Sequence, residues 1–410
     1  MRNLTIDGNR LWQSMMTMAA IGATEKGGVC RLTLTDLDRE SRDLFAEWCE
    51  ASGCSVEVDA MGNMFARRPG RDNSLPPIVA GSHLDSQPTG GKYDGAYGVL
   101  AALEIIRTLN DNDVETDAPI EIAMWTNEEG SRFAPACMGS ATFAGAFTLD
   151  YAHSRTDPDG KTVGEELARI GYLGKGCGER PVGAYFEAHI EQGPILEAEE
   201  KTIGVVTGAQ AQRWYEINLI GMEAHAGPTP MARRKDALLG AAKLVQRVNE
   251  IGHRFQPDAC ATVGVLEVFP ASRNVIPGRV FFTVDFRHPD AETLAEMDAA
   301  LREAGAEIAE NGGLEIDLDQ IWSCEATEFE GSCVEAVRDG AEMAGLKHRD
   351  IISGAGHDAM YVAQIAPAAM IFVPCKDGIS HNELESATPE DLSAGCQVLL
   401  NAILEKAGAR

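Results

Sequence analysis

Apolar runs of strand length alternate with helical patterns at both ends of the chain, and this alternation constrains the fold most strongly. Residues 95–110 repeat apolar side chains every three or four positions, as a helix with one buried face does, and another helix is expected over 389–405. Strand patterns occupy residues 77–83, 119–126, 184–190 and 368–374. The alternation predicts an α/β domain with a mostly parallel sheet and helices on both faces.

The middle of the chain follows a different order. Strand patterns at residues 213–221, 261–268, 279–286 and 314–322 enclose helical patterns at 233–250 and 291–310. The order β-α-β-β-α-β is that of a ferredoxin-like sandwich. A chain of 410 residues is long enough for two domains. We therefore expect one domain built from residues 1–210 and 329–410, with residues 211–328 inserted as the second.

The composition of the chain limits the kinds of molecule that the protein is expected to bind. The net charge of −28 disfavours nucleic acid and anionic membrane surfaces, although a local cation could still bind a small anionic substrate. No apolar run approaches the roughly 18 residues of a membrane helix. The first residues lack the basic and apolar blocks of a secretory signal, and the ten cysteines are scattered without a CxxC pair. These features predict a cytoplasmic protein with free thiols.

Potential metal ligands follow the predicted strands. His83 and His189 lie at or near strand ends, the Glu128–Glu129 pair follows a strand, and Asp94 and His381 occupy glycine-containing loops. Ligands in an open α/β sheet gather beyond the carboxyl ends of the strands. Taken singly, these residues could be a core histidine, a helix-terminal acid or solvated loop acids. Together they predict a divalent metal site, in which a neighbouring glutamate handles a proton.

Imidazole and carboxylate ligands suit Zn²⁺, with Mn²⁺, Co²⁺ or Ni²⁺ as substitutes. If one carboxylate bridged two ions, all five candidates could serve as metal ligands. Asp85, two residues after His83, is expected to hydrogen-bond that imidazole ring and so orient it. A surface or capping role for Asp85 remains open.

Several segments together resemble the hydantoinase/carbamoylase family of dinuclear metal amidohydrolases, in the aminoacylase and carboxypeptidase clan. The matching segments are GSHLDSQPTGGKYDG, WTNEEGSRF, FEAHIEQGP, AHAGPTPMARRKDA, RNVIPG, DFRHP, SGAGHDA and DGISHNE. They cover nearly the whole chain. The segments SQPTGGKYDG, VTGAQAQRW and KDGISHN are most similar to the β-alanine synthase (β-ureidopropionase) branch.

The resemblance implies a role for each candidate ligand. His83, Asp94 and His189 would hold one ion, and Asp94, Glu129 and His381 the other. Glu128 would be the general base and acid. A histidine at position 189, where the clan's peptidases carry a carboxylate, favours a carbamoylase over an aminoacylase or dipeptidase.

The resemblance also implies that the inserted domain is a lid through which the protein forms a homodimer. His225 would polarise the substrate carbonyl, either within its own subunit or across the dimer, and His357 would support the site. Gln192, Asn274 and Arg287 match substrate-binding positions. Arg287 would clamp the substrate carboxylate, because its planar guanidinium can pair with both oxygens.

The favoured reaction is hydrolysis of N-carbamoyl-β-alanine to the free amino acid, ammonia and carbon dioxide. Alternatives are N-carbamoyl-L-α-amino acids and allantoate, since only the pocket shape separates these substrates. A non-catalytic binding protein on the same scaffold is a more remote alternative, because it should have lost a ligand or the base. A nucleotide-binding protein is disfavoured by the absence of a GxGxxG turn or Walker loop.

Overall fold

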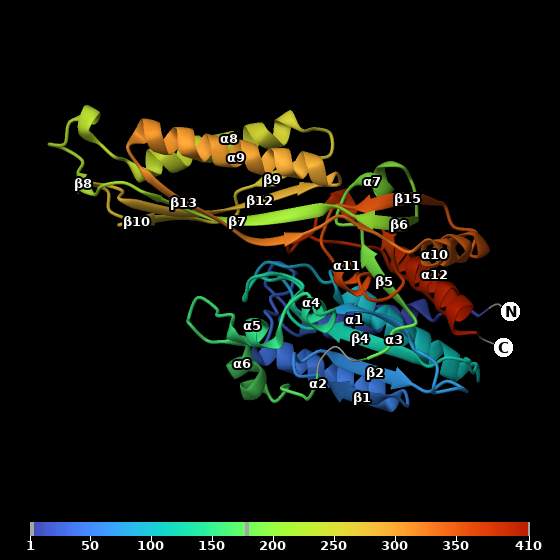
Figure 1. Ribbon diagram of the computed structural model, residues 1–410. Helices are drawn as coiled ribbons and strands as arrows, with labels where there is room; N and C mark the ends of the chain where they lie inside the picture. Colours follow the sequence, from blue (N-terminus) through green and yellow to red (C-terminus); the bar gives the residue numbers. More distant parts are fainter. Residues whose placement is uncertain (1–3, 177–179, 409–410) are drawn as a thin grey trace. The chain divides into compact units, whose positions relative to one another are not determined.

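The computed structural model describes residues 4–176 and 180–408, which form two compact units (Figure 1). One unit comprises the chain up to Gly208 together with the residues from Glu328 onward, and the other is Ala209–Thr327. The sequence patterns predict this division at residues 211 and 328. Each unit has its own hydrophobic core.

The first unit is built on a sheet with strand order β1-β2-β4-β3-β5-β16-β6-β14, in which β15 also pairs with β6. Its strands are β1 (Ser55–Val58), β2 (Met64–Arg68), β3 (Ile78–His83), β4 (Ile120–Trp125), β5 (Ala184–Ile190), β6 (Ile203–Ala209), β14 (Thr327–Glu328), β15 (His348–Ser353) and β16 (Ala368–Val373). The expected α/β class is confirmed.

The sheet is more mixed than the sequence suggested. The central strands β4, β3, β5 and β16 run parallel, as expected. The edges differ, because β1 pairs antiparallel with β2, β2 with β4, and β6 with β16. A short connection joins β1 to β2, and antiparallel neighbours need no crossover helix. The parallel strands are fully buried, which explains why they appeared as continuous apolar runs.

Helices cover both faces of this sheet. Val373 of β16 contacts Gly395 of α12 (Pro389–Ala407), whereas the ring of its neighbour Phe372 faces His357 at the start of α11 (Asp358–Val362). Successive strand residues point to opposite faces, so α11 and α12 lie on opposite sides. The other helices are α1 (Gly8–Ala20), α2 (Asp36–Ala51), α3 (Ala96–Asp111), α4 (Met138–Phe143), α5 (Leu149–Ser154), α6 (Val163–Ile170), α7 (Ile195–Ala198) and α10 (Gly331–Met343).

The second unit contains an antiparallel sheet of order β10-β12-β7-β13, with β9 also paired to β12. Helices α8 (Ala237–Arg254) and α9 (Ala291–Gly312) pack side by side on one face (Figure 1). Its strands are β7 (Ala211–Ile220), β9 (Cys260–Thr262), β10 (Leu266–Phe269), β12 (Arg279–His288) and β13 (Glu315–Cys324). A small ribbon pairs β8 (Ala224–His225) with β11 (Val275–Ile276). The single strand expected over 261–268 is thus divided between β9 and β10.

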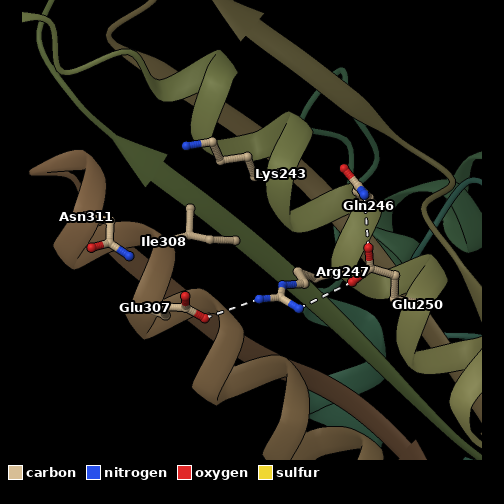
Figure 2. A pocket seen from close by; sticks show the side chains of 7 residues that line it. All are labelled: Lys243, Gln246, Arg247, Glu250, Glu307, Ile308 and Asn311. Atoms are coloured by element: carbon tan, nitrogen blue, oxygen red, sulfur yellow. Dashed lines mark hydrogen bonds and ion pairs between the residues drawn. The ribbon is translucent and has the colours of Figure 1, made fainter.

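An ion pair also connects the two helices of this unit. Arg247 of α8 forms ion pairs with Glu250 on its own helix and with Glu307 of α9, and all three residues line a surface pocket (Figure 2). The pocket is lined mainly by polar side chains and contains none of the candidate site residues. Across the described part of the chain, no helix is both long and apolar enough to cross a membrane.

Candidate metal centre

The five expected metal ligands come together in the first unit, beyond the carboxyl ends of its parallel strands. His83 is the last residue of β3, His189 is the last residue but one of β5, and Glu129 follows β4 by four residues. Asp94 immediately precedes Gly95, the N-cap of α3, and His381 lies in the loop after β16. Residues nearly 300 positions apart in the sequence therefore share one site.

The ligand atoms form two groups that share Asp94. In the first, the Nε2 atoms of His189 and His83 lie 3.1 and 3.6 Å from Asp94 Oδ1. In the second, His381 Nε2 lies 3.2 Å from Asp94 Oδ2 and 3.4 Å from Glu129 Oε2. Within each group, the candidate ligand atoms all lie within 4.8 Å of one another. This is the arrangement that a bridging carboxylate between two ions requires.

The histidine rings are oriented to present Nε2. His83 Nδ1 lies 2.9 Å from the main-chain oxygen of Asp85, and His189 Nδ1 lies 2.9 Å from that of Ile190. A ring nitrogen that faces a carbonyl oxygen must carry a proton, so in the neutral ring the lone pair is on Nε2. His189 Nε2 accordingly accepts a hydrogen bond from the Gly95 amide at 3.2 Å. In their neutral form both rings therefore have the tautomer that a metal ligand needs.

Asp85 acts differently from the expectation. Its main-chain oxygen holds the His83 ring, while its carboxylate is 3.8 Å from His83 Nδ1. The carboxylate instead accepts hydrogen bonds from the amides of Glu128 and Glu129, each at 3.3 Å and each on a different oxygen. The sequence spacing could not distinguish a main-chain contact from a side-chain contact. Asp85 thus links the strand that bears one ligand to the loop that bears two acidic residues.

The protonation of each group in the centre depends on the charges of its neighbours. Burial opposes ionisation of Asp94, yet hydrogen bonds with His189, His381 and His83 outweigh it and hold the pKa of Asp94 well below its usual value. Burial raises the pKa of Glu129 to about 8; His381 opposes this rise, and Asp94 adds to it. Burial lowers the pKa of the three imidazoles, but the neighbouring carboxylates outweigh it: they raise the pKa of His83 and His189, and that of His381 to about 10. Bound cations would therefore displace protons from these rings.

Glu128 lies beside the ligand groups, with Oε2 only 3.4 Å from His83 Nε2. Burial raises the pKa of Glu128 to about 7; His83 opposes the rise, and the carboxylates of Asp94 and Asp85 add to it. A carboxyl group that titrates near neutral pH can both take up and release a proton. The sharp turn after β4, where Asn127 has a φ of 58°, directs Glu128 into the site.

Two candidate supporting residues also lie here. Gln192 donates from Nε2 to Asp94 Oδ2 at 2.9 Å and to the Ser380 hydroxyl at 3.2 Å. Its buried Oε1 has no hydrogen-bond partner within the described residues. The ring of His357 packs edge-on against that of His189, with centroids 4.6 Å apart, and its Nε2 lies 3.0 Å from the Ser353 hydroxyl.

The remaining three candidates belong to the second unit, where His225 and Asn274 lie together and Arg287 lies apart from them. His225 pairs with Val275 in the β8–β11 ribbon, directly beside Asn274. Arg287 lies near the far end of β12, where it is opposite Gln212, and its guanidinium binds the Asp285 carboxylate. From Arg279, at the ribbon end, to Arg287 the strand covers eight steps of about 3.4 Å, or roughly 27 Å.

Comparisons with known proteins identify the family of this chain. A model of peptidase family M20/M25/M40 matches residues 79–405. A crystal structure of a hydantoinase/carbamoylase family amidase from Burkholderia vietnamiensis is 62% identical, with a TM-score of 0.98 and coverage of 99% of this chain and 98% of that one. This chain belongs to the hydantoinase/carbamoylase family. It is therefore a hydrolase, as the sequence motifs indicated.

Two named relatives show the range of substrates among similar proteins. The N-carbamoyl-L-amino-acid amidohydrolase of Rhizobium meliloti is 49% identical over 406 residues, covering 99% of this chain and 98% of its own length. The ureidoglycolate hydrolase of Arabidopsis thaliana is 33% identical over 413 residues, covering 97% and 86%.

Two residues around the centre were missed by the sequence analysis. Glu385 is buried and accepts from the amides of Tyr93 and Asp94, at 2.9 and 3.1 Å. Gln87 donates to Glu129 Oε2 at 2.6 Å. Both lie within six residues of a predicted ligand, in HNELES and GSHLDSQ, so proximity in sequence was the available signal. Their contacts join distant segments and could not be read from either motif alone.

Proposed function

We propose that this protein hydrolyses N-carbamoyl-L-amino acids to the free amino acid, ammonia and carbon dioxide. The observation that carries the proposal is the pair of ligand groups that share Asp94, with Glu128 beside them. The name of the relative from Rhizobium meliloti supports this substrate class. The initial preference for N-carbamoyl-β-alanine has no support among the named relatives, and the α-amino acid alternative replaces it.

The donor set fits two divalent ions. His83, Asp94 and His189 would hold the first, and Asp94, Glu129 and His381 the second. Three imidazoles and two carboxylates suit Zn²⁺, with Mn²⁺, Co²⁺ or Ni²⁺ as substitutes. When bound, such ions lower the pKa of water and polarise a carbonyl group.

Glu128 moves the proton in the proposed reaction. It takes one proton from the attacking water as the water oxygen bonds to the carbamoyl carbon. It then returns that proton to the amino nitrogen as the bond between this nitrogen and the carbamoyl carbon breaks. The released carbamic acid decomposes to ammonia and carbon dioxide. Glu128 is suited to both proton transfers because it is buried and lies beside His83.

We assign substrate recognition to the remaining candidates. Gln192 and His357 would act from the first unit, and Arg287 would bind the substrate carboxylate through its guanidinium. His225 and Asn274 lie at the opposite end of the second unit's sheet from Arg287. A small substrate cannot span that length. We therefore assign His225, as carbonyl-polarising group, and Asn274 to the active site of the partner in a homodimer formed through this unit.

The test is product release by metal-reconstituted enzyme from a substrate panel. The panel contains several N-carbamoyl-L-α-amino acids, their D-enantiomers, N-carbamoyl-β-alanine, allantoate, ureidoglycolate and a dipeptide. We expect the highest kcat/KM for an N-carbamoyl-L-α-amino acid. Preference for ureidoglycolate, which the relative from Arabidopsis thaliana makes the second candidate, would overturn the substrate but keep the metal and base assignments. Inactivity on every compound with metal bound would mean that the proposed substrate class is wrong.

A further inference from the structure

Each carboxylate among the candidate metal ligands accepts a hydrogen bond from a neutral side chain. Gln192 Nε2 donates to Asp94 Oδ2 at 2.9 Å, and Gln87 Nε2 donates to Glu129 Oε2 at 2.6 Å. Neither contact neutralises the carboxylate, but each fixes its rotation. A general base needs the same control, because proton transfer depends on the distance and direction of one oxygen.

The side chain of Glu128 accepts a hydrogen bond from a cysteine. The thiol of Cys137 lies 3.4 Å from Glu128 Oε1, at the contact distance of a hydrogen bond from sulfur. The other oxygen, Oε2, lies 3.4 Å from His83 Nε2. The two oxygens therefore have different surroundings: one faces a buried thiol, and the other faces the ligand atoms.

The loop that carries both residues closes tightly around this contact. The Cys137 amide donates to the main-chain oxygen of Glu128 at 2.7 Å, and the Met138 amide donates to that of Asn127 at 3.1 Å. Cys137 is buried and has a left-handed backbone, with φ 52° and ψ 31°. Such a conformation is uncommon for a residue other than glycine, and here it turns the chain so that the thiol lies beside the carboxylate.

We propose that Cys137 is a positioning residue for Glu128, and that its S–H group donates to Oε1 so that Oε2 carries the transferred proton. The thiol takes no part in bond making or breaking. This proposal rests on the proposed role of Glu128 as general base. It assigns different tasks to the two oxygens of one carboxylate.

The test compares Cys137→Ala and Cys137→Ser with Cys396→Ala as a matched control. Cys396 is also buried, and its thiol contacts the main-chain oxygen of Ala101. With metal content equal to wild type, Cys137→Ala should lower kcat about tenfold and leave KM within about twofold, which is part of the roughly 10²–10⁴-fold that a general base contributes. Cys137→Ser keeps a donor and should recover most of the loss, while the control should retain wild-type kcat.

A double-mutant cycle separates positioning from a general packing effect. In Glu128→Asp the shortened side chain no longer reaches the thiol, so adding Cys137→Ala should lower kcat by less than twofold further. Wild-type kcat in Cys137→Ala, no recovery in Cys137→Ser, or full tenfold additivity in the Glu128→Asp background would overturn the proposal. If Cys137→Ala does not fold, the Cys137→Ser variant decides: a kcat within threefold of wild type supports a donor role, and a larger loss overturns it. If Glu128→Asp itself had wild-type kcat, the assigned base, and not only its positioning, would be wrong.

Discussion

Replacing Asp85 with asparagine is the most informative change outside the metal ligands. The Asp85 carboxylate uses one oxygen for the Glu128 amide and the other for the Glu129 amide. Asparagine has nearly the same shape, but it offers only one oxygen as an acceptor. Its amino group would face a main-chain N–H, so two donors would meet and one buried amide would lose its partner.

The size of the effect follows from that lost partner. Leaving a buried donor unsatisfied costs about 1–3 kcal/mol, which corresponds to roughly 5- to 150-fold in an equilibrium constant. The displaced loop carries Glu129, a predicted ligand, and Glu128, the predicted base. We therefore expect Asp85→Asn to weaken metal binding by about 10- to 100-fold, the range found when groups that orient metal ligands are changed.

The assay is a metal titration of the metal-free variant, followed by kcat at saturating metal. Glu104→Gln serves as the control, because Glu104 is similarly buried but pairs with Arg10 and lies ten residues beyond Asp94, within α3. The control should lose stability and keep its metal affinity. Wild-type metal affinity and wild-type kcat in Asp85→Asn would refute the reasoning that this carboxylate positions the acidic pair.

Three further predictions follow from named contacts. Arg287→Ala should raise KM at least tenfold with little change in kcat. Arg287→Lys should recover only part of this loss, because an ammonium group cannot pair with both carboxylate oxygens as a guanidinium does. An unchanged KM of Arg287→Ala in steady-state kinetics would show that Arg287 does not bind the substrate carboxylate. Glu385→Ala takes the acceptor from the amides of Tyr93 and Asp94 and should reduce metal content, whereas Glu385→Gln keeps one oxygen and should be milder; equal metal content in both variants would contradict this. Chelation should abolish turnover and lower Tm, with recovery on adding Zn²⁺ or Mn²⁺; activity that survives in verified metal-free protein would exclude a metal-dependent reaction.

The sequence predicted the parts of the fold that depend on local pattern. Strands β3, β4, β5 and β16 appear within one residue of their expected limits, because fully buried strands are continuous apolar runs. Helix α8 was less well placed, since it begins at Ala237 and not at residue 233. Residues 231–233 instead form a short 3₁₀ turn before the Asp236 cap. Apolar periodicity does not distinguish such a turn from the first turn of a helix.

The candidate ligands could be predicted for a related reason. A polar residue at the end of a parallel strand has its neighbours set by the topology, so His83 and His189 were expected to meet. Tertiary contacts of single side chains carry no such signal. The role of the Asp85 carboxylate, the reach of Glu385 across some 290 residues to Asp94, and the thiol beside Glu128 all depend on loop conformation. The left-handed backbone of Cys137 has no sequence signature, because most such positions are occupied by glycine.

The most direct measurement is turnover of an N-carbamoyl-L-α-amino acid by Glu128→Gln, with metal content determined on the same sample. Glutamine fills the same space and cannot accept the proton from water. We expect two metal ions per chain, as in the wild type, and a kcat lower by about 10²–10⁴-fold. Near-wild-type turnover with both ions bound would contradict the assignment of Glu128 as the base of a metal-assisted hydrolysis.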